Sequence, residues 1–112
     1  MIEHLTLETF KEKIMDFDTQ KFKNDKPLII KFSAEGWCVP CKTYKPIFEN
    51  AAEEIKGMNF YSVDVEDEME ISELFSIKSV PTTIMINSKG EKKSFSGMMQ
   101  KSKLIEIINS NL

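Results

Sequence analysis

The chain has 112 residues, with 15 lysines and arginines against 18 aspartates and glutamates, a formal net charge of −3. This length suits one domain with its own core, and the sequence contains no run of about 18 apolar residues that would cross a membrane. No basic stripe of the kind that binds nucleic acid is present. We therefore expect a single monomeric domain over residues 1–112 that binds neither nucleic acid nor a membrane.

The first residues, Met1–Glu8, carry acidic side chains and no cationic start followed by an apolar stretch. This composition does not fit a signal peptide, so we expect a cytoplasmic location. In such a reducing compartment, a close pair of cysteines is more often catalytic or metal-binding than a static crosslink.

In the N-terminal half, the apolar pattern predicts two strands separated by a helix. A short strand over residues 2–5 precedes a helix capped by Thr6, with apolar positions at Leu7, Phe10, Ile14 and Phe17. The apolar, β-branched run 28–32 predicts a buried strand. A helix then runs to Gly57, with apolar positions at Tyr44, Ile47, Phe48, Ala51, Ala52 and Ile55.

In the C-terminal half, strands and helices continue to alternate. Strands are predicted over residues 59–65 and 84–86, with a short helix around 71–75 between them. A turn at 87–90 leads into a strand near 91–95, and a final helix has apolar positions at Leu104, Ile105, Ile108 and Leu112. The predicted class is α/β with a mixed sheet.

The only two cysteines, Cys38 and Cys41, stand three residues apart where the 28–32 strand gives way to the following helix. On a helix this spacing brings both sulfur atoms to one face, with Cα atoms close enough for a disulfide. Cys38 lies at the junction, where unpaired N–H groups and the helix dipole stabilise a thiolate. Cys41 lies one turn further in and is more sheltered. This asymmetry indicates an attacking thiol, Cys38, and a resolving thiol, Cys41.

A structural zinc site is the alternative for the cysteines. Zinc takes four ligands, and the chain offers two cysteines and the distant His4, so we expect no metal. His4 has no evident partner. Trp37, directly before Cys38, is expected to be exposed rather than part of the core. Met98 and Met99 either adapt to varied targets or fill the core.

Several motifs carry a resemblance to the thioredoxin family over essentially the whole length. They are His4-Leu5-Thr6, Trp37-Cys38-Val39-Pro40-Cys41-Lys42, Pro46, Val63-Asp64-Val65, Ser79-Val80-Pro81-Thr82, Gly90, Gly97 and the closing Asn111-Leu112. The resemblance implies a thioredoxin fold, an α/β architecture with a central mixed sheet of about five strands flanked by four helices.

The resemblance also implies a cis peptide bond before Pro81, beside the cysteines. A cis bond is tolerated essentially only before proline. Because proline has no N–H, it leaves the Val80 backbone free to meet an extended peptide. Gly97 and Met98 are expected on the other side of this groove, with Trp37, Val39 and Pro40 completing its walls.

The implied activity is protein-disulfide reduction by thiol–disulfide exchange through the Cys38–Cys41 dithiol, with no bound cofactor. Electrons are expected from a thioredoxin reductase, and the substrates are disulfide-containing target proteins. Family members with proline between the cysteines tend to be reductants. Two alternatives stay open: a thioredoxin-like binding module without catalysis, and a disulfide oxidant or isomerase of the same fold.

The sequence departs from the family at two places. Val39-Pro40 stands where thioredoxins commonly have Gly-Pro, and no acid stands in the strand where the family buries an aspartate beneath the resolving cysteine. Lys31 takes that place if Gly36 is an insertion, and Phe32 takes it if there is none. Ser62 stands near the position of a family lysine. Lys31 then either faces Asp64 inside the protein, as a tuning pair, or lies outward on a half-exposed strand.

Overall fold

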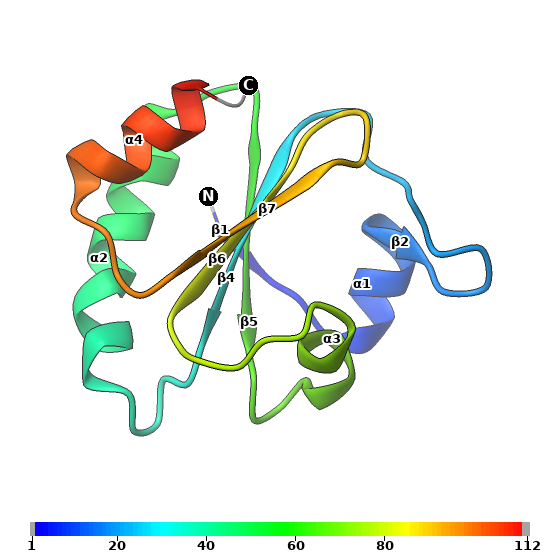
Figure 1. Ribbon diagram of the computed structural model, residues 1–112, viewed down its shortest axis with the longest axis horizontal. Coiled ribbons are helices and arrows are strands. Elements are labelled where there is room, and N and C mark those ends of the chain that lie inside the picture. The colour runs from blue at the N-terminus through cyan, green and yellow to red at the C-terminus, as the bar shows by residue number, and fades with distance from the viewer. Residues whose placement is uncertain (1, 111–112) are drawn as a thin grey trace.

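The computed structural model describes residues 2–110, which form a five-stranded sheet with helices on both faces (Figure 1). The strand order is β1-β5-β4-β6-β7. These strands are β1 (Ile2–His4), β4 (Leu28–Ser33), β5 (Asn59–Asp64), β6 (Thr82–Ile86) and β7 (Lys92–Ser96). The helices are α1 (Leu7–Lys13), α2 (Val39–Glu54), α3 (Met69–Leu74) and α4 (Lys101–Ser110).

The sheet is mixed, as predicted. The central strand β4 runs parallel to β5 and antiparallel to β6, and β1 pairs with β5 in parallel. This register places Lys31 between Ser62 and Thr83. All six residues of β4 are buried, because the strand has neighbours on both sides and helices over both faces.

Side chains alternate across β4 and feed two separate apolar layers. Leu28, Ile30 and Phe32 join the layer that also contains Phe10 of α1 and Ile71 of α3. Ile29 joins the opposite layer, with side chains of α2 and α4 such as Tyr44, Phe48, Leu104 and Ile108. Figure 1 shows α2 and α4 together on one face and α1 and α3 on the other.

The first helix is shorter than predicted. It ends at Lys13, and the chain then forms a small antiparallel hairpin of β2 (Met15–Asp16) and β3 (Lys21–Phe22). Phe17 is therefore outside the helix, although its ring still packs edge-on against Phe10, with centroids 5.8 Å apart. The apolar spacing predicted the contact correctly but assigned it to the wrong element, because a turn of chain can bring the same side chains together.

The other elements deviate only at their ends. Helix α2 stops at Glu54 and Gly57 lies just beyond it with a φ of +82°, while the strand predicted over 59–65 ends at Asp64. The closing Asn111-Leu112 of the predicted final helix lies outside the described residues. Within residues 2–110, no helix is both long and apolar enough to cross a membrane.

Candidate functional site

The turn between β4 and α2 presents Cys38 directly before the first residue of the helix. The backbone N–H groups of Trp37 and Cys38 both donate to the Ala34 carbonyl, at 3.3 and 3.0 Å, which closes the turn. Cys38 is the N-cap of α2, and its Sγ accepts the Cys41 N–H at 3.1 Å. Pro40 fits the first turn, where a backbone N–H has no helical partner. The sulfur of Cys38 thus takes the role that a serine or aspartate oxygen usually plays at a cap.

Cys38 and Cys41 form a disulfide, with Cα atoms 5.2 Å apart. Cys41 is fully buried, whereas Cys38 keeps 4% of its surface exposed. Both pack with Ala34 in a small apolar cluster bordered by Val65 and Val80. Cys38 is therefore more exposed to solvent than Cys41, as predicted, but the difference in exposure is small in the oxidised protein.

The segment before β6 lies against the disulfide. The peptide bond between Val80 and Pro81 is cis, as the resemblance implied, and the Val80 carbonyl oxygen lies 3.8 Å from Cys38 Sγ. Among the described residues, the Val80 backbone makes no backbone hydrogen bond. The Gly97 N–H donates to the Pro81 carbonyl at 2.8 Å, which places Gly97 beside this segment. An extended peptide has free backbone groups to pair with here.

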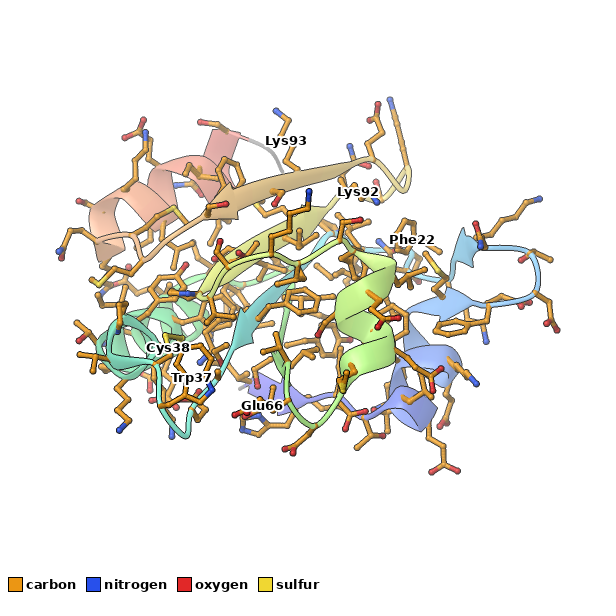
Figure 2. The ribbon with its side chains drawn as sticks, turned by 60° about the horizontal axis from the view of Figure 1, so that its bottom comes forward. Phe22, Trp37, Cys38, Glu66, Lys92 and Lys93 are labelled. Carbon is orange, nitrogen blue, oxygen red and sulfur yellow. A yellow bond between two sulfur atoms is a disulfide. The ribbon has the colours of Figure 1, made fainter. Side chains whose placement is uncertain are left out.

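A cleft of about 290 Å³ adjoins the disulfide and is lined by Trp37, Val65, Ile77, Lys78, Ser79 and Val80. Trp37 is 61% exposed, as expected, and Figure 2 shows it next to Cys38 at the start of α2. Val39 is 70% exposed, on the first turn of the same helix. Met98 and Met99 are half-buried against the layer of α2 and α4, a position between the two alternatives given for them.

Lys31 does not lie outward on a half-exposed strand. Its side chain is 2% exposed, and its Nζ lies 3.4 Å from Glu35 Oε1 and 5.6 Å from the centre of the Phe48 ring. Since Phe48 belongs to α2, Lys31 points to the α2 face, whereas Phe32 points to the opposite layer. Strand alternation therefore puts Lys31, and not Phe32, on the side of the sheet that carries Cys41.

The predicted pairing of Lys31 with Asp64 is wrong. Asp64 is opposite Ser33 in the sheet register, and its Oδ1 accepts the Glu66 N–H in the loop that follows β5. The counter-charge of Lys31 is instead Glu35, which also accepts a hydrogen bond from the Ser33 hydroxyl at 3.3 Å. Glu35 lies in the turn before Cys38, and it is closer to Lys31 along the chain than any acid of β5 is.

His4 has a partner that the sequence did not reveal. Its Nδ1 contacts the Ser62 hydroxyl across the parallel pairing of β1 with β5. No group of three or more possible metal ligands occurs within residues 2–110.

Tyr44 is a second residue whose role was missed. Its hydroxyl shares a 2.8 Å hydrogen bond with the Thr83 hydroxyl, and burial raises the pKa of Tyr44 to about 12. This buried bond ties α2, three residues after Cys41, to β6, two residues after Pro81. In the sequence, Tyr44 fitted the apolar face of the helix and gave no sign of a polar partner.

Comparisons with known proteins agree with this geometry. The family model described as Thioredoxin matches residues 1–110. A thioredoxin from Borreliella burgdorferi is 37% identical and covers 93% of this chain and 92% of its own length. One from Mycoplasma genitalium is also 37% identical, over 80% of this chain and 86% of its own.

Solved structures match the fold closely. Chloroplastic thioredoxin z superposes with a TM-score of 0.80 at 23% identity, covering 97% of this chain and 92% of its own. The thioredoxin of Malassezia sympodialis gives a TM-score of 0.77 at 27% identity, covering 99% and 90%. Together with the Cys38–Cys41 disulfide at the start of α2, these matches show that the chain belongs to the thioredoxin family of protein-disulfide oxidoreductases, which work through a redox-active disulfide and need no bound cofactor.

Proposed function

We propose that this chain, as a single monomeric domain, reduces disulfides of target proteins in the cytoplasm, with Cys38 as nucleophile and Cys41 as resolving thiol. The observation that carries the proposal is the position of Cys38 as N-cap of α2, with its sulfur accepting the Cys41 N–H beside the Val80 carbonyl. A cap sulfur that already accepts an N–H is held where a negative charge is stabilised by the helix. Cys41, fully buried, is reached by Cys38 far more easily than by a protein substrate.

The reaction follows from this asymmetry. The Cys38 thiolate attacks one sulfur of the target disulfide, forms a mixed disulfide and releases the other target sulfur as a thiolate. Cys41 then loses its proton and attacks Cys38, which re-forms the Cys38–Cys41 bond and releases the second target sulfur. In total, two electrons and two protons pass from the dithiol to the target.

The groove walls support this role. Val80 offers backbone groups without a backbone partner next to Cys38, and Trp37 lines the cleft beside it. We assign Val39, Pro40 and Met98 to the rest of the apolar surface that a target contacts. Gly97 adds no side chain to the wall formed with Pro81. A target segment bound in extended form beside Val80 would bring its disulfide next to Cys38.

The dithiol has to be regenerated after each turnover. We assign this step to a flavin-dependent thioredoxin reductase, as the family implies. The family to which the chain belongs supports the existence of such a reductase and of target proteins.

Insulin reduction tests the proposal. With dithiothreitol or a thioredoxin reductase with its electron donor, the protein should accelerate the precipitation of insulin chains, and Cys38→Ser should abolish this. The matched variant Cys41→Ser should instead accumulate a mixed disulfide with the target, detectable by mass spectrometry. No acceleration by the unaltered protein would point to a binding module, and trapping at Cys41 but not at Cys38 would reverse the assigned roles.

A further inference from the structure

The cleft beside the disulfide combines apolar walls with one cation. Trp37, Val65, Ile77 and Val80 supply the apolar surface, and Lys78 is the only charged residue that lines it. The Trp37 ring makes no contact with another aromatic ring among the described residues, so its exposed face is free to cover an apolar side chain.

Lys78 is exposed and makes no ion pair within residues 2–110. It stands two residues before Val80, whose carbonyl oxygen lies 3.8 Å from Cys38 Sγ. An extended chain advances about 3.3 Å per residue, so a side chain two or three residues from a bound half-cystine falls within reach of the Lys78 ammonium.

Two acidic residues lie outside the cleft lining, on either side of Val65 in the chain. Val65 lies between Asp64 and Glu66 in the chain, and the Glu66 carboxylate lies 3.9 Å from the place that a Cβ would take at Gly36. Carboxylates of a target would be repelled by these acids and attracted to Lys78. The cleft is thus electrostatically asymmetric.

We propose that Lys78 is a specificity-determining residue for disulfide reduction, selecting target segments that carry an apolar residue next to the half-cystine and a carboxylate two or three residues away. This inference rests on the proposed function and names the substrate class of the same site. Trp37 and its apolar neighbours hold the apolar side chain, and the Lys78 ammonium pairs with the carboxylate.

The expected selectivity is modest, because the ion pair forms at an exposed position. Such pairs change rates or affinities by about 1.4- to 5-fold at low ionic strength, and salt screens them. The preference should therefore shrink as sodium chloride rises from about 10 mM to about 500 mM. A preference that is independent of salt would contradict an ionic origin.

The experiment compares two peptides that each carry one cysteine as a mixed disulfide with thionitrobenzoate. They have leucine next to the cysteine and differ only in glutamate or lysine two residues away from it. Stopped-flow measurement of thionitrobenzoate release by the pre-reduced full chain gives the rate constant for each. The unaltered protein should react about 2- to 5-fold faster with the glutamate peptide.

Two variants and one control test the assignment. Lys78→Gln should remove the preference and Lys78→Glu should reverse it. Lys89→Glu makes the same change of net charge at an exposed position in the β6–β7 turn, at the other end of β6, and should keep the preference for glutamate. A Lys78→Glu protein that retains the preference of the unaltered protein would overturn the proposal.

A binding readout separates recognition from chemistry. Trp37 is the only tryptophan and lines the cleft, so its fluorescence reports occupancy in the oxidised protein. Peptides with serine in place of cysteine should show the same order of affinity and the same response to the Lys78 variants. If the unaltered protein reduces neither peptide nor insulin, the proposed function fails; if it reduces both peptides equally, only the role of Lys78 fails.

Discussion

At the scale of single residues, Cys38 and Cys41 differ in their hydrogen bonds as well as in their burial. The Cys38 sulfur accepts a backbone N–H and lies 3.8 Å from the Val80 carbonyl oxygen, whereas Cys41 is fully buried and its sulfur makes no hydrogen bond among the described residues. We therefore expect Cys38 to be the more reactive thiol in the reduced protein.

Alkylation should reveal this difference. In the reduced protein near pH 7, iodoacetamide should modify Cys38 at least about tenfold faster than Cys41, because the thiolate fraction and the access both favour Cys38. Peptide mapping after short exposures measures the two rates, with urea-unfolded protein as the control in which they should become similar. Faster modification of Cys41 in the folded protein would invert the assignment.

Lys31 shows how a buried charge is accommodated on the Cys41 side of the sheet, in the place where the family buries an acid. Its ammonium has one carboxylate partner, Glu35, and an aromatic face, Phe48. A buried ion pair is often replaceable by apolar residues at little cost, so stability alone does not explain why a lysine is kept. We therefore retain Lys31 as a candidate tuning residue, acting through Glu35 and the turn before Cys38.

Replacing Lys31 tests this tuning. Lys31→Asp would put a buried carboxyl next to Glu35, and both burial and the neighbouring carboxylate favour its protonation near neutral pH, where it can exchange a proton with Cys41. Attack by Cys38 should change less than about twofold, while resolution by Cys41 should accelerate by up to about 100-fold.

Stopped-flow Trp37 fluorescence between pH 6 and 9 resolves the two steps. Lys31→Met is the matched control, because it removes the lysine charge without supplying an acid and should leave resolution slow. Identical resolution rates for the unaltered protein and Lys31→Asp across this range would show that position 31 does not govern Cys41.

At the scale of elements, two glycines allow a structural effect to be separated from a functional one. Gly57 follows α2 with a φ of +82° and Gly97 follows β7 with a φ of +85°, and a Cβ added at either would meet no atom within 4 Å. The backbone cost of alanine should therefore be similar at both, about 1–2 kcal/mol. Only Gly97 lies beside Pro81.

Gly97→Ala and Gly57→Ala should lose similar free energies of unfolding, measured in urea. Gly97→Ala should in addition lower the rate of insulin reduction several-fold, since its methyl group would occupy space that a bound target segment needs. Gly57→Ala should reduce insulin at the normal rate. Equal activity of the two variants would remove Gly97 from the groove.

The elements that the sequence predicted correctly are those with strong periodicity. The apolar run of β4 and the apolar face of α2 were located to within a few residues because burial repeats along them. The β2–β3 hairpin was missed since each strand has two residues, too few for any period to appear. The end of α1 was misplaced for a different reason: Phe17 keeps the apolar spacing of the helix although it lies in the hairpin that follows.

The features of the candidate site that depend on neighbouring residues in the chain could be predicted from the sequence. Those that depend on packing between distant segments could not. The spacing of Cys38 and Cys41 and the helix start are local features, and both were confirmed. The Lys31–Glu35 pair and the Tyr44–Thr83 bond depend on which face of the sheet a side chain occupies and on side-chain reach. The sequence alone did not decide whether Gly36 is a one-residue insertion. It therefore did not determine whether Lys31 or Phe32 lies on the side of the sheet that carries Cys41.

At the scale of the whole molecule, the disulfide contributes to stability mainly through the chain it closes. Cys38 and Cys41 are three residues apart, and closing so short a loop stabilises the folded state by about 2 kcal/mol in the chain-entropy model. The sign of the measured difference carries functional information, because a fold that is more stable when oxidised holds its disulfide firmly and acts as a reductant. Oxidants of this chemistry are instead stabilised in the reduced form.

We therefore expect the oxidised protein to be more stable than the reduced protein by about 2 kcal/mol in urea, which corresponds to roughly 5–10 °C in Tm. Unfolding is followed by circular dichroism with and without dithiothreitol, and the Cys38→Ser/Cys41→Ser double variant should show no response to the reductant. The difference in stability also shifts the reduction potential of the Cys38–Cys41 disulfide. Each 1.4 kcal/mol by which the oxidised form is more stable lowers this potential by about 30 mV. A reduced protein that melts above the oxidised one would favour the oxidant alternative, since the folded structure would then drive electrons toward Cys38 and Cys41 instead of away from them.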